Sequence, residues 1–408
     1  MLSVLEARQR LLASLPVCGV ERVPLAQADS RVLAADVRAP ADSPRFNNSS
    51  MDGFAVRAAD VTRASKEKPV RLPVVGDVPA GAVLGGSLGA GQAVRIMTGA
   101  GLPAGADAIV PVEDTDAAVA QAGAALPREV SIYRPVSAGD YVRPAGEDFR
   151  AGDDLMHPGL RLRPQDLGLL AMLGIADVSV FRKPRVAILS SGNELVPVGG
   201  DLAPGKIYET NSVALGALVA SCGAEAMNVG IARDELQAVQ SHLESAAEIG
   251  ADLIITSAGV SVGAYDYLRE AVLSRGELDF WKVNMRPGKP FAFGRYREIP
   301  TIGLPGNPVS AFVGFEVFVR PALQKMAGAQ NWQRRCMMAR LLEDVNSDGR
   351  ESYLRVQIQE LDEGPGILLT GHQGSGNLYS LVRAEGLMVV PAGVKELSAG
   401  SLAEVWPF

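Results

Sequence analysis

The segment from Arg185 to Gly328 constrains the fold most strongly, because short apolar runs alternate there with stretches of helical spacing. The apolar runs are RVAILS (185–190) and the first halves of 251–266 and 300–319, and the helical stretches include 211–225 and 234–250. Two parallel strands can be joined only by a long crossover connection, usually a helix. The alternation therefore predicts a doubly wound α/β domain, with a parallel sheet covered by helices on both faces.

Three polar turns directly follow the predicted strands of this domain. They carry Glu194, Asp266 and Asn307, and Asn307 is placed to cap a helix whose first residue is Pro308. Ligands of open α/β sheets bind outside the carboxyl ends of the strands, so the three turns are predicted to converge there. A site that combines carboxylates with helix N-termini suits a metal ion and an anionic, phosphate-bearing ligand.

The length of 408 residues predicts at least two domains, because a single core stops growing well below that size. We predict a discontinuous helical domain, a β-rich insert, the α/β domain and a C-terminal β-barrel, since Val- and Ile-rich runs broken by Gly and Pro are typical of β structure. In that order they span 1–24 with 140–176, 25–139, 177–328 and 329–408. The helical stretches 3–15 and 160–174 have similar apolar faces, so we expect them to pack together.

Charge and composition exclude several classes of partner. The formal charge of −7 and the pI of about 5.3 argue against nucleic acid or an anionic membrane as the main ligand. No apolar run approaches the roughly 20 residues of a membrane span. Ser3 and Glu6 form a capping-box pattern where a secretory signal would stand, so a cytoplasmic protein is expected. Cys18, Cys222 and Cys336 are too widely spaced for a zinc motif.

One segment concentrates positive charge, with Lys282, Arg286 and Lys289 close together. A solvated basic turn before the next strand is the simpler alternative. Prolines on both sides of the Gly288–Lys289 pair stiffen the backbone, however, and a solvated turn does not need this. We therefore expect the three cations to capture an anion, and the glycine-rich loop 371–377 suits the same purpose because it exposes backbone N–H groups.

Acidic residues in turns form a second group of candidates. Asp52, Asp148, Glu194 and Asp266 can each be explained singly by turn chemistry or helix capping. Carboxylates and ammonium groups in one crevice fit a divalent cation that bridges the carboxylates to phosphate oxygens, while the lysines hold a second anion. The combination predicts such a site.

Nine short motifs occur in order across nearly the whole chain. They are FNNSSMDGFAVR (46–57), RIMTGAGLPAGADAIVPVED (95–114), RPAGEDF (143–149), SSGNEL (190–195), IYETNS (207–212), SAGVSVGAYDY (257–267), RPGKPFAFG (286–294), GLPGNPVSA (303–311) and GSGNLYSL (374–381). Together they resemble the molybdopterin molybdenumtransferases, which insert molybdenum in molybdenum-cofactor synthesis, a family that includes the E domain of gephyrin.

The resemblance implies an elongated, four-part homodimer and a reaction between adenylylated molybdopterin and molybdate. The adenylyl phosphate linkage is cleaved, and molybdenum cofactor and AMP are formed with a divalent metal such as Mg²⁺. In this family the pterin dithiolene, rather than cysteine, ligates molybdenum. A molybdopterin adenylyltransferase and molybdoenzyme-maturation proteins are the implied partners; no nucleic acid or membrane partner is expected.

The resemblance also assigns functions to residues whose motifs match. The implied catalytic residues are Asp52, Thr98, Asp148, Glu194 and Asp266, and Glu209 with Asp266 is implied to bind the metal. The implied substrate-binding residues are Lys282, Arg286, Lys289, Pro290, Pro305, Asn307, Ser310, Arg355 and Ser375. Fixed cations with neutral hydroxyl donors suit a tetrahedral oxyanion. In the dimer, residues of the insert would complete the site of the opposite subunit.

Two positions depart from the pattern of the family. Glu209 stands where the family usually has Asp, and Ala258 stands where Gly is common, so that a methyl group limits how closely a phosphate can approach. We expect both changes to be tolerated.

Two other functions fit the same sequence features. One is a peptide-binding scaffold, which gephyrin exemplifies on this fold, and the other is a general pyrophosphate-cleaving enzyme. Molybdate and tungstate are nearly identical oxyanions, so a tungstate-specific insertase is a further alternative.

Overall fold

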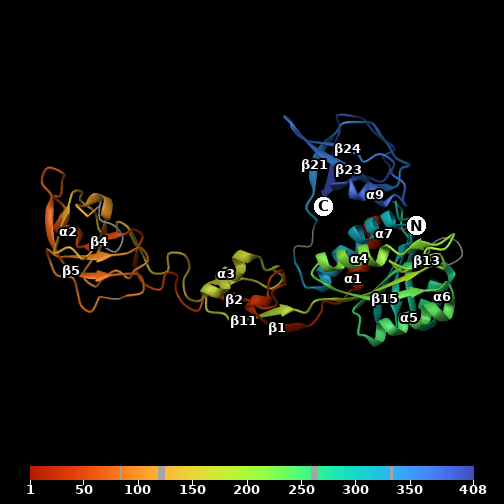
Figure 1. Cartoon of the computed structure of the whole chain (residues 1–408), viewed down its shortest axis with the longest axis horizontal. Helices are drawn as coiled ribbons and strands as arrows, with labels where there is room; N and C mark the ends of the chain where they lie inside the picture. The colour runs from red at the N-terminus through yellow and green to blue at the C-terminus, as the bar shows by residue number, and fades with distance from the viewer. Residues whose placement is uncertain (83, 118–124, 259–264, 331–333) are drawn as a thin grey trace. The chain divides into compact units, whose positions relative to one another are not determined.

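The computed structural model describes residues 1–82, 84–117, 125–258, 265–330 and 334–408 (Figure 1). For Ala258, Tyr265, Asp266 and Trp281 only the backbone is described. The chain divides into two compact units, one formed by Asp36–Met156 and the other by Met1–Ala35 with His157–Phe408. The predicted insert, 25–139, overlaps the first of these, and the four domain limits stay predictions.

The larger unit contains a central six-stranded sheet with strand order β15-β12-β16-β20-β19-β17. The strands are β15 (Glu225–Ala232), β12 (Arg185–Ser191), β16 (Leu253–Ala258), β20 (Ile299–Pro305), β19 (Pro290–Tyr296) and β17 (Gly276–Lys282). The first four are parallel, as predicted. β19 and β17 add antiparallel pairs at one edge, because Arg297 and Glu298 join β19 to β20 in a tight hairpin that needs no crossover helix.

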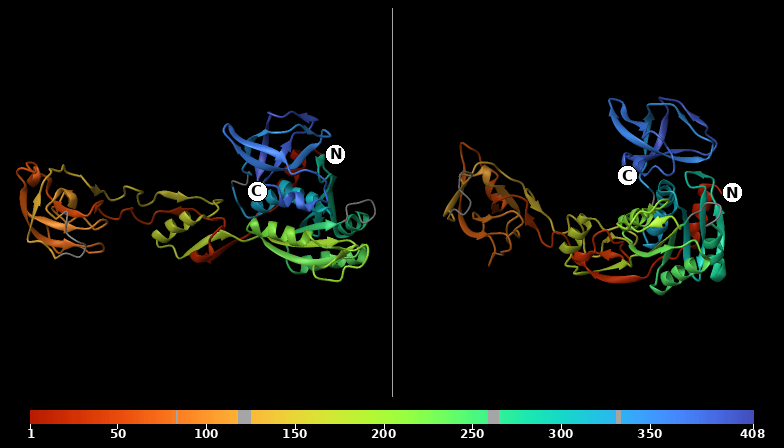
Figure 2. Two further views of the ribbon diagram at one scale, coloured as in Figure 1. Left: turned by 45° about the horizontal axis from the view of Figure 1, so that its top comes forward. Right: turned by 45° about the vertical axis from the view of Figure 1, so that its right-hand side comes forward.

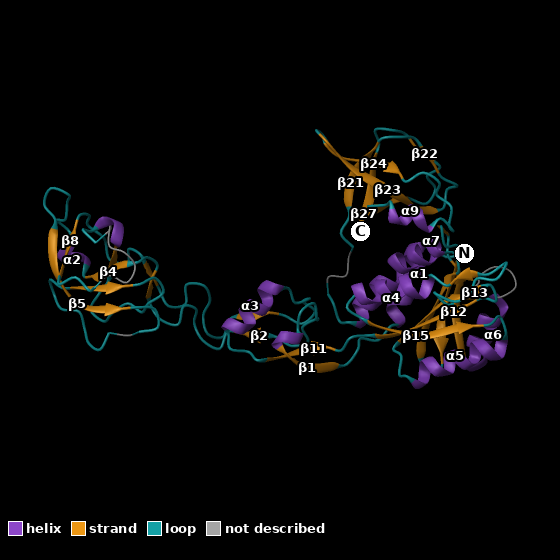
Figure 3. Cartoon of the chain, viewed as in Figure 1, coloured by secondary structure: helices purple, strands orange, loops and turns teal. Residues whose placement is uncertain are grey.

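Helices cover both faces of this sheet, which confirms the doubly wound arrangement (Figure 3). The helices are α4 (Asn211–Ser221) and α7 (Pro308–Gly314) on one face, and α5 (Leu236–Glu248) and α6 (Tyr265–Arg275) on the other. Side chains of β12 alternate between the two cores: Val186 and Ile188 join the α4/α7 side, and Ala187 and Leu189 join the α5/α6 side. The central strands are therefore apolar on both faces.

The first helix of the chain packs on the α/β domain. α1 (Val4–Ser14) has the predicted capping box of Ser3 and Glu6. It contacts α8 (Arg320–Met326) and the π-helical turn η3 (Phe315–Val319), and its buried face joins the central core. α3 (Pro164–Met172) contacts η1 (Leu25–Gln27) instead, so the expected packing of stretch 3–15 against stretch 160–174 is wrong. An apolar face requires a partner but does not specify which one.

The C-terminal strands close into a small barrel beside the central sheet (Figure 2). Its strands are β21 (Met337–Leu341), β23 (Glu351–Leu361), β24 (Gly364–Leu369), β25 (Gly386–Val390) and β27 (Leu402–Pro407), while β22 (Val345–Asn346) pairs with β26 (Glu396–Leu397). β18 (Met285–Arg286) of the cationic segment pairs with β23, and α9 (Leu378–Val382) contacts α7. The barrel therefore meets the α/β domain at the cationic segment and at α7.

The smaller unit is rich in short strands, as the sequence predicts. Its sheet has the order β7-β4-β6-β5-β8, formed by β7 (Ala108–Pro111), β4 (Gly53–Val56), β6 (Ala93–Ile96), β5 (Val70–Val78) and β8 (Glu129–Ile132). Further pairs are β3 (Asn48–Ser49) with β9 (Val142–Arg143), and β2 (Val37–Arg38) with β10 (Asp154–Met156). Phe54 and Ala55 join separate cores on the two faces of this sheet.

The remaining elements are α2 (Ala58–Val61), η2 (Val112–Asp114) and the parallel pair of β13 (Leu195–Val196) with β14 (Ile207–Tyr208). β1 (Val20–Pro24) pairs with β11 (Asp177–Phe181) in the larger unit. No helix among the described residues is long and apolar enough to cross a lipid bilayer.

Candidate functional site

A cavity of about 620 Å³ lies at the carboxyl ends of the parallel strands in the larger unit. Ser191 at the end of β12, Ser257 near the end of β16 and Pro305 at the end of β20 all line it. The predicted site residues that line it are Glu194, Arg286, Lys289, Pro290, Pro305, Asn307, Ser310 and Ser375. The structure thus brings together residues that span more than 180 positions of sequence, from the strand turns, the cationic segment and the C-terminal loop.

The cationic segment forms one wall of the cavity. Arg286, Lys289 and Pro290 line it, and the peptide bond between Arg286 and Pro287 is cis. Gly288 adopts a positive φ of 103°, a conformation that strains any residue with a Cβ. Lys282, exposed at the end of β17, is not among the described lining residues, so its predicted contact with substrate stays a prediction.

Arg350 also lines the cavity, and sequence reasoning missed it. Its Nε and Nη2 donate to Asp348 Oδ2 at 3.0 and 2.5 Å, and Nη1 donates to the carbonyl of Met285 at 3.3 Å. The same carboxylate lies 3.7 Å from Arg286, and the hydrogen bonds from Arg350 hold the pKa of Asp348 below its usual range. The turn Asn346–Gly349 was visible in the sequence, but its approach to Arg286 depends on the pairing of β18 with β23.

The C-terminal barrel supplies a loop and a buried arginine. Gln373, Gly374 and Ser375 line the cavity, and the anion contact expected of the 371–377 loop stays a prediction. Behind the loop, Arg355 is 0% exposed; Nε donates to Ser380 Oγ at 3.0 Å and Nη2 to the Gly374 carbonyl at 3.1 Å. Its Nη1 is buried without a hydrogen-bond partner. Burial, together with the charge of Arg286, lowers the pKa of Arg355 to about 10.

Two helix N-termini meet at the cavity. Asn307 and Pro308 open α7, as predicted, but the Asn307 side chain does not cap the helix. Its Nδ2 instead donates to Ser375 Oγ at 2.9 Å, and the Val309 amide donates to the Ser375 carbonyl at 3.1 Å. Asn211, the first residue of α4, lines the cavity and donates to the Gly306 carbonyl at 2.7 Å. Helix N-termini carry partial positive charge, which favours an anion between them.

The two predicted glutamates differ in their surroundings. Glu194 is exposed and lines the cavity. Glu209 is buried, where it accepts hydrogen bonds from Ser190 Oγ at 2.9 Å, from the Ser212 amide at 2.8 Å and from the Ser212 hydroxyl. Ser190 Oγ is 2.9 Å from Ser257 Oγ, which connects this buried carboxylate to the cavity wall. The longer side chain at position 209 is therefore accommodated by local hydroxyl and amide donors.

The predicted magnesium site does not assemble from the described side chains. No group of three or more His, Cys, Asp or Glu residues among them is arranged to hold a metal ion. Glu209 is already occupied by its own donors, and Glu194 alone offers too few ligands for a metal site made of protein side chains. The side chains of Asp266, second residue of α6, and of Ala258 lie outside the described part of the chain.

The remaining predicted residues belong to the smaller unit. Asp52, exposed before β4, accepts hydrogen bonds from the Thr98 amide at 2.7 Å and from Thr98 Oγ1 at 2.8 Å. These two bonds, the amide bond first, lower the pKa of Asp52. Asp148 accepts from Arg143 Nη2 at 2.6 Å and from Ser43 Oγ at 3.1 Å. Neighbouring donors position both carboxylates; their catalytic function stays a prediction.

The fold and the cavity define a class of protein. In this parallel α/β domain, one cavity is surrounded by strand ends, two helix N-termini and several guanidinium and ammonium groups. Such a cavity suits an oxyanion or a phosphate-bearing ligand. The cavity is cationic although the whole chain has a charge of −7. Arg286, Lys289 and Arg350 line it, and the described carboxylates next to them are Glu194, which also lines it, and Asp348, which pairs with both arginines.

Comparison with known proteins identifies the family. Family models described as "MoeA N-terminal region (domain I and II)", "Probable molybdopterin binding domain" and "MoeA C-terminal region (domain IV)" match residues 2–174, 187–325 and 338–408. Molybdopterin molybdenumtransferase 2 of Mycobacterium tuberculosis is 41% identical, with 100% of this chain and 99% of that protein aligned. The chain belongs to the MoeA family, the molybdopterin molybdenumtransferases.

Other relatives and solved structures agree with this membership. Molybdopterin molybdenumtransferase of Nostoc sp. is 37% identical over 93% of this chain and 87% of its own length, and that of Haemophilus influenzae is 34% identical over 100% and 99%. The crystal structure of a molybdopterin biosynthesis MoeA protein from Pyrococcus horikoshii has a TM-score of 0.82 at 34% identity, covering 100% of this chain and 99% of that one.

Proposed function

We propose that this enzyme transfers molybdenum from molybdate to adenylylated molybdopterin, releasing AMP and forming molybdenum cofactor. The observation that carries the proposal is Arg355, which is fully buried behind the cavity loop with its Nη1 amino group left without a hydrogen-bond partner. A buried charge with an unsatisfied donor is costly unless a ligand completes it. Arg355 itself is not among the described lining residues; we propose that the Gly374–Ser375 loop in front of it shifts when a tetrahedral oxyanion binds, so that the anion supplies the missing acceptor.

The residues around this point suit an oxyanion of molybdate size. Lys289 brings a second cation, and the hydroxyl groups of Ser310 and Ser375 bring neutral donors to the same cavity. Asn307 fixes Ser375 Oγ by a 2.9 Å hydrogen bond, so one donor is positioned before the ligand arrives. Preorganised donors of this kind bind the charge of an anion without further reorganisation.

The adenylylated pterin would occupy the rest of the same cavity. The cavity volume of about 620 Å³ is well above the volume of a small oxyanion and falls within the usual range for cofactor sites. The N-terminus of α7, together with Arg286 and Arg350, offers positive charge for the phosphate groups, whereas the N-terminus of α4 already faces the Glu209 carboxylate. In this scheme the phosphate linkage lies beside the oxyanion, so that AMP release and molybdenum transfer are linked.

Mg²⁺ is part of the proposal, although the described side chains form no complete metal site. Substrate phosphate oxygens commonly provide several ligands of this ion, and Glu194 is the described carboxylate that lines the cavity. We expect EDTA to stop AMP release and added Mg²⁺ to restore it. Release at an unchanged rate after metal removal would refute this part of the proposal.

A homodimer is also proposed, in which Asp52, Thr98 and Asp148 of one subunit complete the cavity of the other. Its support is the resemblance in sequence together with the two carboxylates that the smaller unit holds in fixed positions. The partners that deliver the substrate and receive the product, and the cytoplasm as its location, remain expectations from the same resemblance.

The test is to mix the purified protein with adenylylated molybdopterin and Mg²⁺, add molybdate, and follow AMP and metal-loaded pterin together. We expect both products to appear only when molybdate or its analogue tungstate is present. AMP release that is indifferent to the oxyanion would support a general pyrophosphate-cleaving enzyme instead. Absence of both products under all conditions would favour the scaffold alternative.

A further inference from the structure

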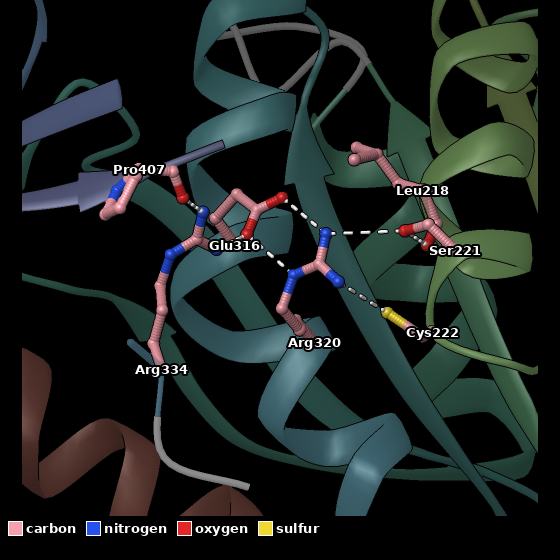
Figure 4. A network of polar contacts seen from close by, with 7 residues as sticks. All are labelled: Leu218, Ser221, Cys222, Glu316, Arg320, Arg334 and Pro407. Atoms are coloured by element: carbon pink, nitrogen blue, oxygen red, sulfur yellow. Dashed lines mark hydrogen bonds and ion pairs between the residues drawn. The ribbon is translucent and has the colours of Figure 1, made fainter. Parts of the chain in front are cut away.

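A buried network of charges joins the α/β domain to the C-terminal barrel on the side of α7 and α8 (Figure 4). At its centre is Glu316 in η3, whose side chain is 1% exposed. Arg320 Nε and Nη2 donate to its two carboxylate oxygens at 2.7 and 2.8 Å, and Arg334 Nη1 donates to it from the opposite side. Nothing in the proposed reaction uses these three residues.

Arg334 belongs to the barrel side of this junction. Its Nη2 donates to the carbonyl of Pro407, at the end of β27, at 3.1 Å, and its guanidinium lies 5.6 Å from the centre of the Trp406 ring. The planar guanidinium therefore contacts the last strand of the barrel and Glu316 of the α/β domain at the same time. The Arg334 guanidinium therefore fixes both the distance and the relative orientation of β27 and Glu316.

Arg320 attaches the same carboxylate to α4. Its Nη1 donates to Cys222 Sγ at 3.3 Å and its Nη2 to Ser221 Oγ at 3.4 Å, both at the C-terminal end of that helix (Figure 4). The N-terminal residue of α4, Asn211, lines the cavity, as does Ser310 in the first turn of α7. Two helices thus run from the cavity to the charge network, α4 directly and α7 through its continuation in η3.

Stability alone does not account for this network. A buried ion pair is often no more stable than apolar residues of similar volume, and here Arg334 Nε is buried without a hydrogen-bond partner. A fork-shaped cation with two acceptors on different domains, in contrast, restricts their relative orientation. The cavity needs that restriction, because Ser375 and the loop in front of Arg355 come from the barrel while Asn307 and Ser310 come from the α/β domain.

We propose that Glu316 and Arg334 are positioning residues that orient the barrel, so that Ser375 and Arg355 meet the N-terminus of α7 in the geometry the oxyanion requires. The inference depends on the proposed function only in naming molybdate as the ligand. Loss of the Arg334 contact leaves Glu316 with both bonds to Arg320, so the carboxylate is not left unpaired. The fold is therefore expected to survive an Arg334 substitution.

The test compares Arg334→Met with Arg335→Met, which removes the neighbouring arginine, an exposed residue. For Arg334→Met we expect the KM for molybdate to rise about ten-fold, the effect of losing roughly one charge-assisted hydrogen bond, with kcat at saturating molybdate within about two-fold. Arg335→Met should match the wild type. Arg334→Lys keeps the charge but cannot bridge both acceptors, and it is expected to recover only part of the loss.

Amide hydrogen exchange gives a readout that does not depend on the reaction. In the ligand-free full-length protein, segments 371–378 and 305–311 should exchange at least about five-fold faster in Arg334→Met than in Arg335→Met, because the junction opens more often. Unchanged exchange, or an unchanged KM for molybdate despite faster exchange, would overturn the positioning role. If the wild type itself shows no molybdate-dependent turnover, the proposed function fails, and exchange alone decides whether Arg334 holds the loop.

Discussion

At the scale of single residues, the main feature is the conflict between burial and charge at Arg355. Its side chain has no exposure, its pKa is lowered to about 10, and it is still protonated at neutral pH. In the empty protein it is therefore an uncompensated cation with an unsatisfied donor. Residues with strongly perturbed pKa values next to a cavity are candidates for function, and this one points to an anion.

Replacing this residue separates binding from stability. Arg355→Met removes the buried charge, so we expect the free energy of unfolding to fall by no more than about 2 kcal/mol while molybdate binds at least about 100-fold more weakly. Isothermal titration and urea unfolding measure the two effects. Arg383→Met, an exposed arginine in the same domain, is the control. Wild-type affinity in Arg355→Met would remove the basis of the proposed oxyanion site.

A second prediction at this scale concerns the pH dependence of Asp52. Hydrogen bonds from Thr98 lower its pKa, so the stability it contributes is present above the unfolded pKa and is lost as pH falls through the folded pKa. Thr98→Val removes the hydroxyl donor but keeps the amide, so the pKa of Asp52 should rise part of the way to its usual value of 3.8.

Carboxyl carbon NMR titration measures this pKa directly. Thr62→Val is a suitable control, because that hydroxyl donates only to a nearby helix carbonyl, Ala59, on the exposed surface of the same unit. An Asp52 pKa that is identical in Thr98→Val and in the wild type would show that the hydroxyl does not bond to the carboxylate in solution.

At the scale of elements, the buried face of α1 contributes to the core of the α/β domain. Leu11 has no exposure and lies in the core that covers the α4 and α7 face of the sheet, whereas Leu5 on the same helix is 54% exposed. Leu11→Ala should therefore lower the free energy of unfolding of the larger unit by about 3 kcal/mol. Leu5→Ala should change it by less than about 0.5 kcal/mol.

Urea unfolding followed by the far-ultraviolet circular dichroism of both variants provides the comparison. The prediction fails if the two substitutions have equal effects, because α1 would then not be docked on α8 and η3 as the structure has it.

At the scale of the whole molecule, the proposed homodimer can be tested by mixing two inactivated variants. If the insert of one subunit completes the cavity of the other, then Asp52→Ala and Arg355→Met protein, each nearly inactive alone at molybdate concentrations below the wild-type KM, regain activity when unfolded together and refolded as a mixture. Half of the dimers then contain one of each chain and one intact site, so about a quarter of the wild-type rate is expected. No recovery in a mixture that has demonstrably exchanged subunits would place each site within a single chain.

Much of the architecture could be predicted from the sequence, because helices and strands depend largely on local patterns of apolar and capping residues. Buried runs such as Val186–Leu189 and the Asn307–Pro308 helix start are visible without knowledge of any contact. The predicted packing partner of α1 is wrong, because an amphipathic face does not determine which surface it covers. Partners so distant in sequence are chosen by tertiary packing alone.

Site residues that lie in a recognisable sequence motif could be predicted. Residues that reach the cavity only through the pairing of distant strands could not. The sequence motifs predict Lys289, Asn307 and Ser375 as site residues, and all three line one cavity. Arg350 and Asn211 line it as well, but they reach it through the β18–β23 pairing and the start of α4. Arg350 lies outside every motif quoted above, and Asn211 lies within IYETNS (207–212) but is not predicted there as a site residue.

The central claim is that an oxyanion binds in the cavity next to Arg355 Nη1. Crystals of the full-length protein soaked in tungstate, which replaces molybdate and scatters anomalously, test it most directly. We predict an anomalous peak in this cavity, placed so that tungstate oxygens lie within hydrogen-bond distance of Arg355 Nη1 and Lys289 Nζ, and its disappearance in Arg355→Met. Tungstate bound at full occupancy elsewhere, with none in this cavity, would contradict it.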